Sequence, residues 1–146
     1  MDTQVAQRYS KVDLFSMKGR MGRRYYLFYS MIPIIFLWLA ARYTGVSNIG
    51  IDITTGSFFL FSLTTAIVFF ILVYLTIQRC HDFDKSGWYA IFVIIPFSNL
   101  IYASISSING LNRYGEMPEE APIFISTANY LLIPFMIISM IIAYFL

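Results

Sequence analysis

Charge is scarce in this chain of 146 residues. Only 12% of the residues are Asp, Glu, Lys or Arg, about half the share usual in a soluble domain, whereas 58% are hydrophobic. A soluble fold of this size needs a polar surface, and the chain has too few charged residues to build one. The composition therefore excludes a soluble domain and favours a membrane protein that forms a single domain, residues 1–146.

Residues that commonly perform chemistry are also few. The chain has one cysteine and one histidine, so it cannot close an internal disulfide, and no spacing typical of a metal site occurs. No apolar segment carries an ionisable residue near its middle, which ion-coupled carriers usually need. We therefore expect no catalytic, cofactor-binding or metal-binding residues, no enzymatic activity and no nucleic-acid partner.

Long apolar segments are what the sequence does contain. Four of them lie at about 25–43, 57–78, 88–107 and 128–146. Each is near the length that crosses a bilayer as a helix. Prolines interrupt three of the four, at Pro33, Pro96 and Pro134. We predict an all-α fold, an integral membrane bundle of four transmembrane helices.

A polar and basic leader, residues 1–24, precedes the first apolar segment. Apolar residues recur in it at helical spacing, namely Val5, Tyr9, Val12 and Phe15. This pattern predicts a short amphipathic helix at the membrane surface, and a tail without fixed structure is the alternative. The polar leader is long for the charged part of a signal peptide, which favours an uncleaved first helix.

Lysine and arginine are distributed unevenly along the chain. Six of the ten lie in the leader, and Arg79 and Lys85 lie between the second and third apolar segments. Only Arg42 and Arg113 would face the opposite side of a four-span bundle. The positive-inside rule then places the N-terminus in the cytoplasm, and four spans return the C-terminus to it.

The segment Gln78–Trp88, called here the charged tip, joins the second and third apolar segments. Arg79 and His81 would lie at the end of one helix, where the helix dipole favours positive charge. Asp82 and Asp84 would lie just before the next helix, where it favours negative charge. A purely structural turn therefore accounts for most of the tip.

The second half of the tip fits the same interpretation. Ser86 is a predicted N-cap, and Gly87 permits a tight turn. Trp88 is the kind of residue that lies at the headgroup level. Lys85 alone runs against the dipole ordering, and it could pair with either aspartate.

Docking of an anionic lipid or a partner subunit is the alternative use of the tip. Its cations would share one side of the membrane with those of the leader, where a lipid phosphate could bind. An acid/base pair of His81 with Asp82 or Asp84 is a weaker possibility. We expect a leader arginine within about 4 Å of an aspartate oxygen of the tip. The candidate docking residues are Arg20, Arg23, Arg24, Arg79, His81, Asp82, Asp84, Lys85 and Trp88.

Three stretches together resemble the bacterial domain-of-unknown-function family 805, a family of small multi-pass inner-membrane proteins. They are the basic stretch 15–24 before Tyr25-Tyr26, the tip at 79–88, and Gly110–Gly115 with Pro118. The tip is similar to the family's Arg-x-His-Asp-x-x-x-Ser-x-Trp signature. Members usually have an acidic residue where Tyr25 stands, and many end soon after the third stretch, whereas here a fourth apolar segment follows.

The resemblance implies a bacterial inner-membrane location and no established activity, cofactor or substrate. With the residues above, it leads to one expectation about function. We expect a non-enzymatic membrane protein that docks anionic lipid, or a partner subunit or second copy, on a basic cytoplasmic face. A small transporter or channel-like oligomer is the alternative.

Overall fold

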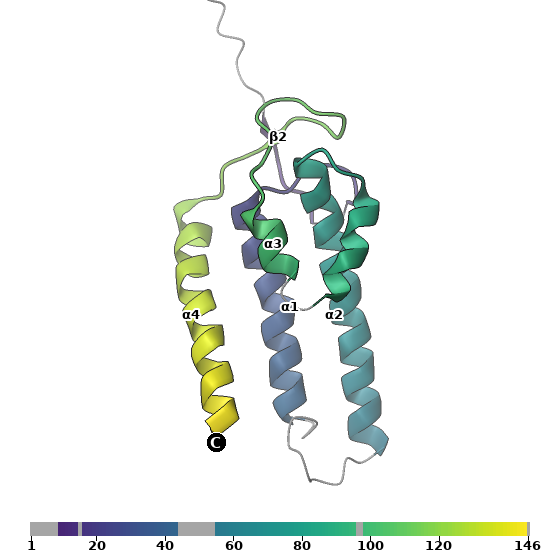
Figure 1. Cartoon of the computed structure of the whole chain (residues 1–146), viewed down its shortest axis with the longest axis vertical. Coiled ribbons are helices and arrows are strands. Elements are labelled where there is room, and N and C mark those ends of the chain that lie inside the picture. The colour runs from purple at the N-terminus through teal and green to yellow at the C-terminus, as the bar shows by residue number, and fades with distance from the viewer. Residues whose placement is uncertain (1–8, 15, 44–54, 96–97, 146) are drawn as a thin grey trace, which may run out of the picture.

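The computed structural model describes residues 9–14, 16–43, 55–95 and 98–145. Its elements, in order, are β1 (Tyr9–Ser10), α1 (Arg23–Tyr43), α2 (Thr55–Asp82), the 3₁₀ helix η1 (Gly87–Ile94), α3 (Ser98–Ser104), β2 (Met117–Pro118) and α4 (Ile123–Phe145). Figure 1 shows α1, α2 and α4 as long rods side by side, with η1 and α3 beside their upper half. Most of the described residues are helical, as the composition predicts.

Two of the helices, α1 and α2, are long and apolar enough to cross a membrane. Only 11% of the apolar part of α2 is buried inside the protein, whereas the core helix of a soluble protein is mostly buried. A shorter apolar stretch, Ile123–Ser139, lies in α4. The apolar faces of these helices therefore need a lipid environment or a partner to cover them.

The predicted third span, 88–107, is wrong as a single helix. The segment folds as η1 and α3, which have 8 and 7 residues, on either side of Pro96. A seven-residue α-helix is about 10 Å long, far less than the roughly 30 Å of a bilayer's hydrocarbon core. A proline disfavours helical backbone in the residue before it, and Ile95 is accordingly extended, with φ −77° and ψ 124°.

The two short helices form a hairpin, called here the re-entrant hairpin (residues 87–95 and 98–104). Figure 1 shows η1 descending beside α2 and α3 returning to the upper end. The backbone confirms the return, because Ile108 N donates to Asp82 O at 3.2 Å. The hairpin therefore enters and leaves at one end of the bundle, called here the polar end (residues 9–14, 16–24, 78–87 and 105–122).

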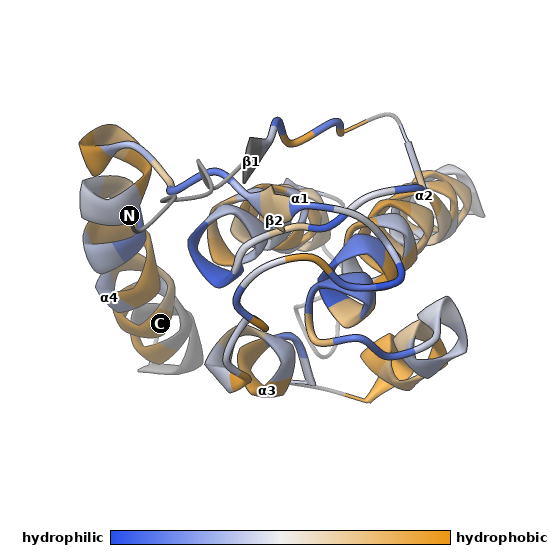
Figure 2. Cartoon of the chain, turned by 90° about the horizontal axis from the view of Figure 1, so that it is seen from above, coloured by the Kyte–Doolittle hydropathy of each residue, from blue (hydrophilic) through white to orange (hydrophobic). Residues whose placement is uncertain are grey.

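The loop after the hairpin also lies at the polar end, where the four-span topology did not place it. Its backbone and side chains contact the leader and the tip, as described below. Seen from above, hydrophilic residues cover the connections that close this end (Figure 2). This arrangement does not fit the predicted crossing between the tip and residues 109–127.

The amphipathic helix predicted for the leader is also wrong over its described part. Tyr9–Ser10 pairs in parallel with Met117–Pro118, and the described residues between Ser10 and Arg23 contain no helix. The Gln78 side chain, at the end of α2, donates to two carbonyl oxygens of the leader. Long-range partners thus satisfy backbone groups that a helix would have paired internally. Val5 and Phe15 lie outside the described residues.

The buried core lies just below the polar end, where all four α-helices meet. Tyr26 is completely buried, packs edge-on against Tyr102 and shares a 3.0 Å hydrogen bond with Thr76. Cys80 is buried beside them, as expected of a small apolar residue. On the other side of α1, Asn129 of α4 donates to the carbonyl oxygen of Arg24 at 2.9 Å. This packing holds α4 against α1.

Candidate functional site

Two arginines and one aspartate are buried together at the polar end. Arg20, Arg79 and Asp82, called here the arginine–aspartate cluster, are each at most 2% exposed. Arg20 Nη2 lies 3.1 Å from Asp82 Oδ1, and Arg79 Nη1 pairs with Asp82 Oδ2. The predicted contact between a leader arginine and a tip carboxylate is thereby confirmed.

Local structure explains how the three side chains meet. Asp82 is the last residue of α2, and Arg79 precedes it by three positions, so both project from one face of the helix. Arg20 comes from the leader, which is fixed to the end of α2 by a backbone hydrogen bond from Met21 N to Gln78 O at 3.2 Å. The cluster therefore joins the leader to α2.

The arginines also hold the chain that leaves the re-entrant hairpin. Arg79 Nε donates to Tyr102 O at 3.0 Å, and its Nη2 donates to Ile105 O. Carbonyl groups in the last turn of a helix have no partner within the helix, and a guanidinium satisfies them here. Arg20 donates to carbonyl oxygens farther along the same segment, those of Ile108, Gly110 and Gly115.

The geometry makes the cluster a structural clamp. Its charged groups are removed from solvent, and its donors are occupied by a carboxylate and by backbone carbonyls. Ser107 Oγ also donates to Asp82 Oδ2. A direct contact of Arg20, Arg79 or Asp82 with a lipid headgroup does not fit this burial.

His81 is part of a second set of contacts beside the cluster. Its ring stacks on Tyr114, with centroids 3.8 Å apart, and its Nδ1 lies 3.2 Å from Gly19 O. Asn112 Nδ2 donates to the carbonyl oxygen of His81 at 2.8 Å. Asp82 meanwhile is bound by the two arginines, so the geometry does not favour the weak acid/base interpretation of His81 with Asp82.

Asp84 has a partner that the sequence did not suggest. Arg113 Nε lies 3.0 Å from Asp84 Oδ1, and both side chains are substantially exposed. The four-span topology placed Arg113 on the opposite side of the membrane, and Lys85 was a possible partner of Asp82 or of Asp84. An exposed pair of this kind contributes about 0–1 kcal/mol.

The predicted cap at Ser86 is confirmed, although it caps a 3₁₀ helix instead of a membrane-spanning α-helix. The Ser86 side chain accepts from Trp88 N at 3.5 Å. Gly87 has a different role from the one expected. Within the charged tip, the residue with positive φ is Asp84, at 58°. A Cβ on Gly87 would lie 2.9 Å from Ile77 Cγ2. Gly87 therefore lets η1 pack closely on α2.

Gly87→Ala should destabilise the protein by about 1–3 kcal/mol, the usual cost of overpacking. The branched Ile77 side chain has little freedom to move away from the added methyl group. Gly56→Ala is the matched control, because a Cβ there meets no atom within 4 Å. Thermal unfolding in mild detergent measures both, and equal stabilities for the two variants would contradict the close packing at Gly87.

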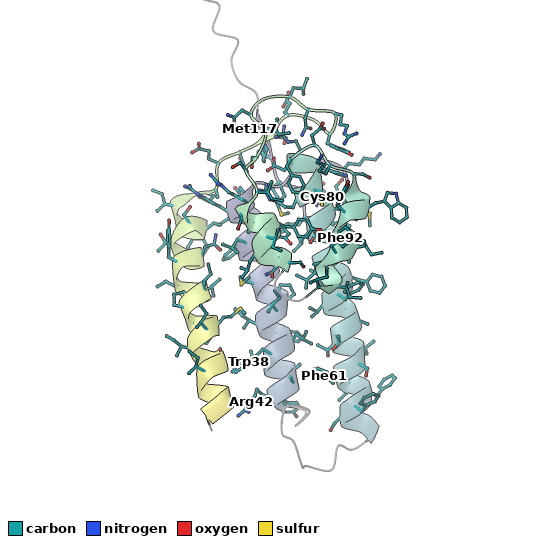
Figure 3. The ribbon with its side chains drawn as sticks, viewed as in Figure 1. Trp38, Arg42, Phe61, Cys80, Phe92 and Met117 are labelled. Atoms are coloured by element: carbon teal, nitrogen blue, oxygen red, sulfur yellow. The ribbon has the colours of Figure 1, made fainter. Side chains whose placement is uncertain are left out.

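The remaining cations of the polar end are accessible. Lys11, Lys18, Arg23, Arg24 and Lys85 are exposed and are called here the basic face. Trp88, at the start of η1, is 84% exposed. Nitrogen and oxygen atoms concentrate at this end in Figure 3, above the apolar side chains of the long helices. Of the predicted docking residues, Arg23, Arg24, Lys85 and Trp88 are accessible, and the Asp84 side chain is exposed within its pair with Arg113.

Several residues of the site were missed by the sequence reasoning. Asn112 and Tyr114 lie within the third stretch of the family resemblance, so a signal for them existed. Gly19 lies within the first stretch, so a signal for it existed as well. Ser107 had none, because an isolated serine beside a membrane segment is common. All four act through contacts between segments far apart in the sequence.

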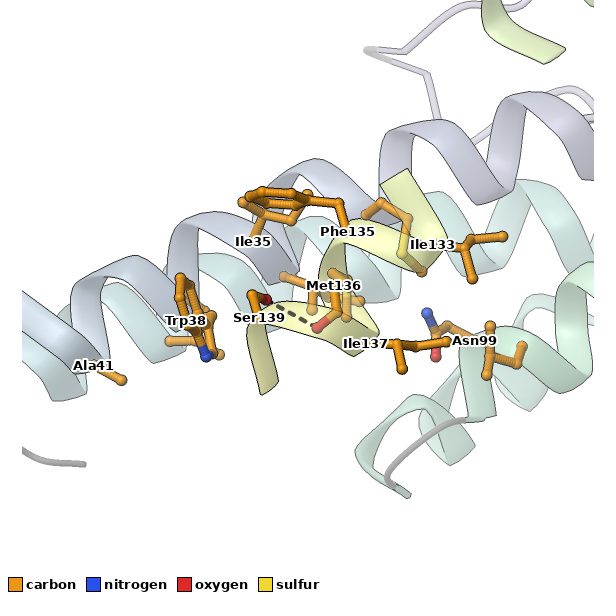
Figure 4. Close-up of a pocket in the computed structure, with 13 residues that line it drawn as sticks. Ile35, Trp38, Ala41, Asn99, Ile133, Phe135, Met136, Ile137 and Ser139 are labelled. Carbon is orange, nitrogen blue, oxygen red and sulfur yellow. Dashed lines mark hydrogen bonds between the residues drawn. The ribbon is translucent and has the colours of Figure 1, made fainter. Parts of the chain in front are cut away.

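Below the polar end, α1, α3 and α4 enclose an apolar groove of about 380 Å³ (Figure 4). Trp38 and Met136 contribute to its walls, and Asn99 and Ser139 add polar groups. A second groove, of about 750 Å³, lies between α1 and α2. Among the described residues, no group of three or more His, Cys, Asp or Glu side chains could hold a metal ion.

Comparisons with known proteins show similarity to an inner membrane protein and to one protein family. The chain is 28% identical over 112 residues to the inner membrane protein YhaH of Escherichia coli K12, an alignment that covers 72% of this chain and 88% of the relative. YhaH of Escherichia coli O157:H7 matches with the same values. No solved structure matches. The family model of DUF805, described as a protein of unknown function, matches residues 14–116, from the leader to the turn after the re-entrant hairpin. This chain therefore belongs to the DUF805 family.

Proposed function

We propose that this chain is a non-enzymatic inner-membrane protein that docks anionic lipid on its cytoplasmic side. The observation that carries the proposal is the basic face, five exposed cations at the end of an apolar bundle. Cations near an anionic membrane surface contribute roughly 1 kcal/mol each. The exposed Trp88 suits the boundary between headgroups and hydrocarbon.

The same proposal includes a topology of three spans, formed by α1, α2 and α4. The re-entrant hairpin stays within one leaflet, because its ends meet at the polar end. Of the nine described Lys and Arg residues, only Arg42 lies at the opposite end. The positive-inside rule favours a cytoplasmic polar end and a C-terminus on the outer side.

The transporter alternative has less support. Both grooves are lined mainly by apolar side chains, whereas a pathway for ions or polar solutes needs polar groups along its length. The described residues instead concentrate their charge at one end. A second copy or a partner subunit on the basic face remains compatible with the same surface.

Arg23→Gln/Arg24→Gln/Lys85→Gln should reduce the phosphatidylglycerol and cardiolipin that remain bound in mild detergent. Three cations at roughly 1 kcal/mol each predict a loss of affinity well above tenfold. Lipid mass spectrometry of the purified protein measures the effect. These side chains are exposed, so folding should be preserved.

Arg42→Gln is the matched control, because it removes one exposed cation at the opposite end. Its lipid content should equal that of the wild type. Unchanged anionic lipid in the triple variant, with the protein folded and inserted, would reject docking on the basic face.

A further inference from the structure

The larger groove runs between α1 and α2 and is open to the membrane. Its walls are side chains of α1 from Tyr29 to Phe36 and of α2 from Thr64 to Leu75. Leu14 of the leader contributes to it at the polar end. Ile32, Phe36 and Ile67 are about half exposed, so the groove has no cover among the described residues.

The polarity of the groove changes along its length. Tyr29 and Tyr74 line the part nearer the polar end, and both are half-buried. Tyr29 lies six residues past Arg23, which is about 9 Å along the axis of α1. That depth is close to the boundary between headgroups and hydrocarbon. Beyond the tyrosines, the lining is apolar except for Thr64.

Two cations of the leader flank Leu14 in the sequence, at the polar end of the groove. Lys11 and Lys18 lie three residues before and four residues after Leu14, and both are exposed. Gln78 Nε2 donates to Asp13 O at 3.0 Å, which fixes this part of the leader to the end of α2. Positive charge, phenolic hydroxyls and an apolar groove therefore follow one another from the membrane surface inward.

We infer that this groove binds one acyl chain of an anionic phospholipid from the cytoplasmic leaflet. Lys11 and Lys18 attract its phosphate, and the hydroxyls of Tyr29 and Tyr74 donate to phosphate or ester oxygens. This inference rests on the proposed function and names the site and the class of lipid. A helix of a second copy would bury the groove but would offer no phosphate to Lys11 and Lys18, which outnumber the one carboxylate between them in the sequence, that of Asp13.

The experiment measures lipid exchange in nanodiscs that contain phosphatidylglycerol and phosphatidylcholine. The wild type should retain a slowly exchanging phosphatidylglycerol. Lys11→Gln/Lys18→Gln should weaken its retention roughly thirtyfold, from about 1 kcal/mol per cation. Ile67→Trp, which adds bulk to the groove, should abolish slow exchange. Ile137→Trp adds the same bulk to the other groove and is the matched control.

Tyr29→Phe/Tyr74→Phe keeps the shape of the groove and removes only the hydroxyls. It should accelerate phosphatidylglycerol exchange several-fold, and this variant tests the groove even if Ile67→Trp does not fold. One result would overturn lipid binding in the groove and keep docking on the basic face. In it, Ile67→Trp and Tyr29→Phe/Tyr74→Phe exchange lipid as the wild type does, whereas the Arg23/Arg24/Lys85 variant loses lipid. No preference for phosphatidylglycerol in the wild type would overturn both. A dimer that dissociates in Ile67→Trp without a change in lipid would make the groove a subunit interface.

Discussion

Asp82→Asn should destabilise the protein by about 3–5 kcal/mol, the usual cost of breaking a buried ion pair. The substitution preserves the shape of the side chain but removes the only carboxylate in the arginine–aspartate cluster. Arg20 and Arg79 would then remain buried without a counter-charge. The new amide group would also place its N–H donors against guanidinium donors. We expect most of the protein to be lost during purification, and thermal unfolding of any remainder measures the effect.

Asp84→Asn is the matched control for this prediction. It removes the same charge two residues later, where the pair with Arg113 is exposed. Asparagine tolerates the positive φ of Asp84, so only about 0–1 kcal/mol should be lost. Equal stability of the two variants would show that the cluster does not hold the leader, α2 and the hairpin together.

The charged tip was the part of the site most accessible to sequence reasoning. The spacing of Arg79 and Asp82 places both on one helix face, and a basic leader on the same side of the membrane suggests Arg20 as a partner. These are short-range patterns or simple charge arguments. The other partners of the two arginines could not be anticipated, because they are backbone carbonyl groups from residues 102–115.

The re-entrant hairpin shows why hydropathy alone does not establish the topology. The segment 88–107 is apolar for the length of a span, and hydropathy does not record where its two ends lie. Pro96 divides the segment, but prolines also occur inside α1 and α4, which continue through them. The difference is that Arg79 and Asp82 bind the backbone after α3 and hold it at the polar end.

The helix predicted for the leader is absent from its described part for a related reason. Four apolar residues at helical spacing suggested a surface helix, yet Tyr9 and Ser10 pair with Met117 and Pro118. The partner strand is more than a hundred residues away, in a loop that the four-span topology placed across the membrane. Because the loop was expected on the other side of the membrane, its strand could not be recognised as the partner of the leader.

Alkaline phosphatase fusions should separate the three-span topology from the four-span topology. The enzyme is active only outside the cytoplasm, so each fusion reports one side of the membrane. Both topologies predict activity after Ser47 and none after Asp84. They differ for fusions after Glu120 and after Leu146. Only a membrane span between the tip and Glu120 would place Glu120 outside the cytoplasm.

The three-span topology predicts an inactive fusion after Glu120 and an active fusion after Leu146. The physical reason is the set of contacts that keep residues 108–115 beside Arg20 and Asp82, at the end of the bundle where cations concentrate. The Asp84 fusion is the internal control for a cytoplasmic position, and the Ser47 fusion is the control for an outer one. High activity after Glu120 with none after Leu146 would restore the four-span bundle and separate the loop from the cluster. Activity at neither of the last two sites would mean that α4 lies on the cytoplasmic side, and α1 and α2 would then be the only spans.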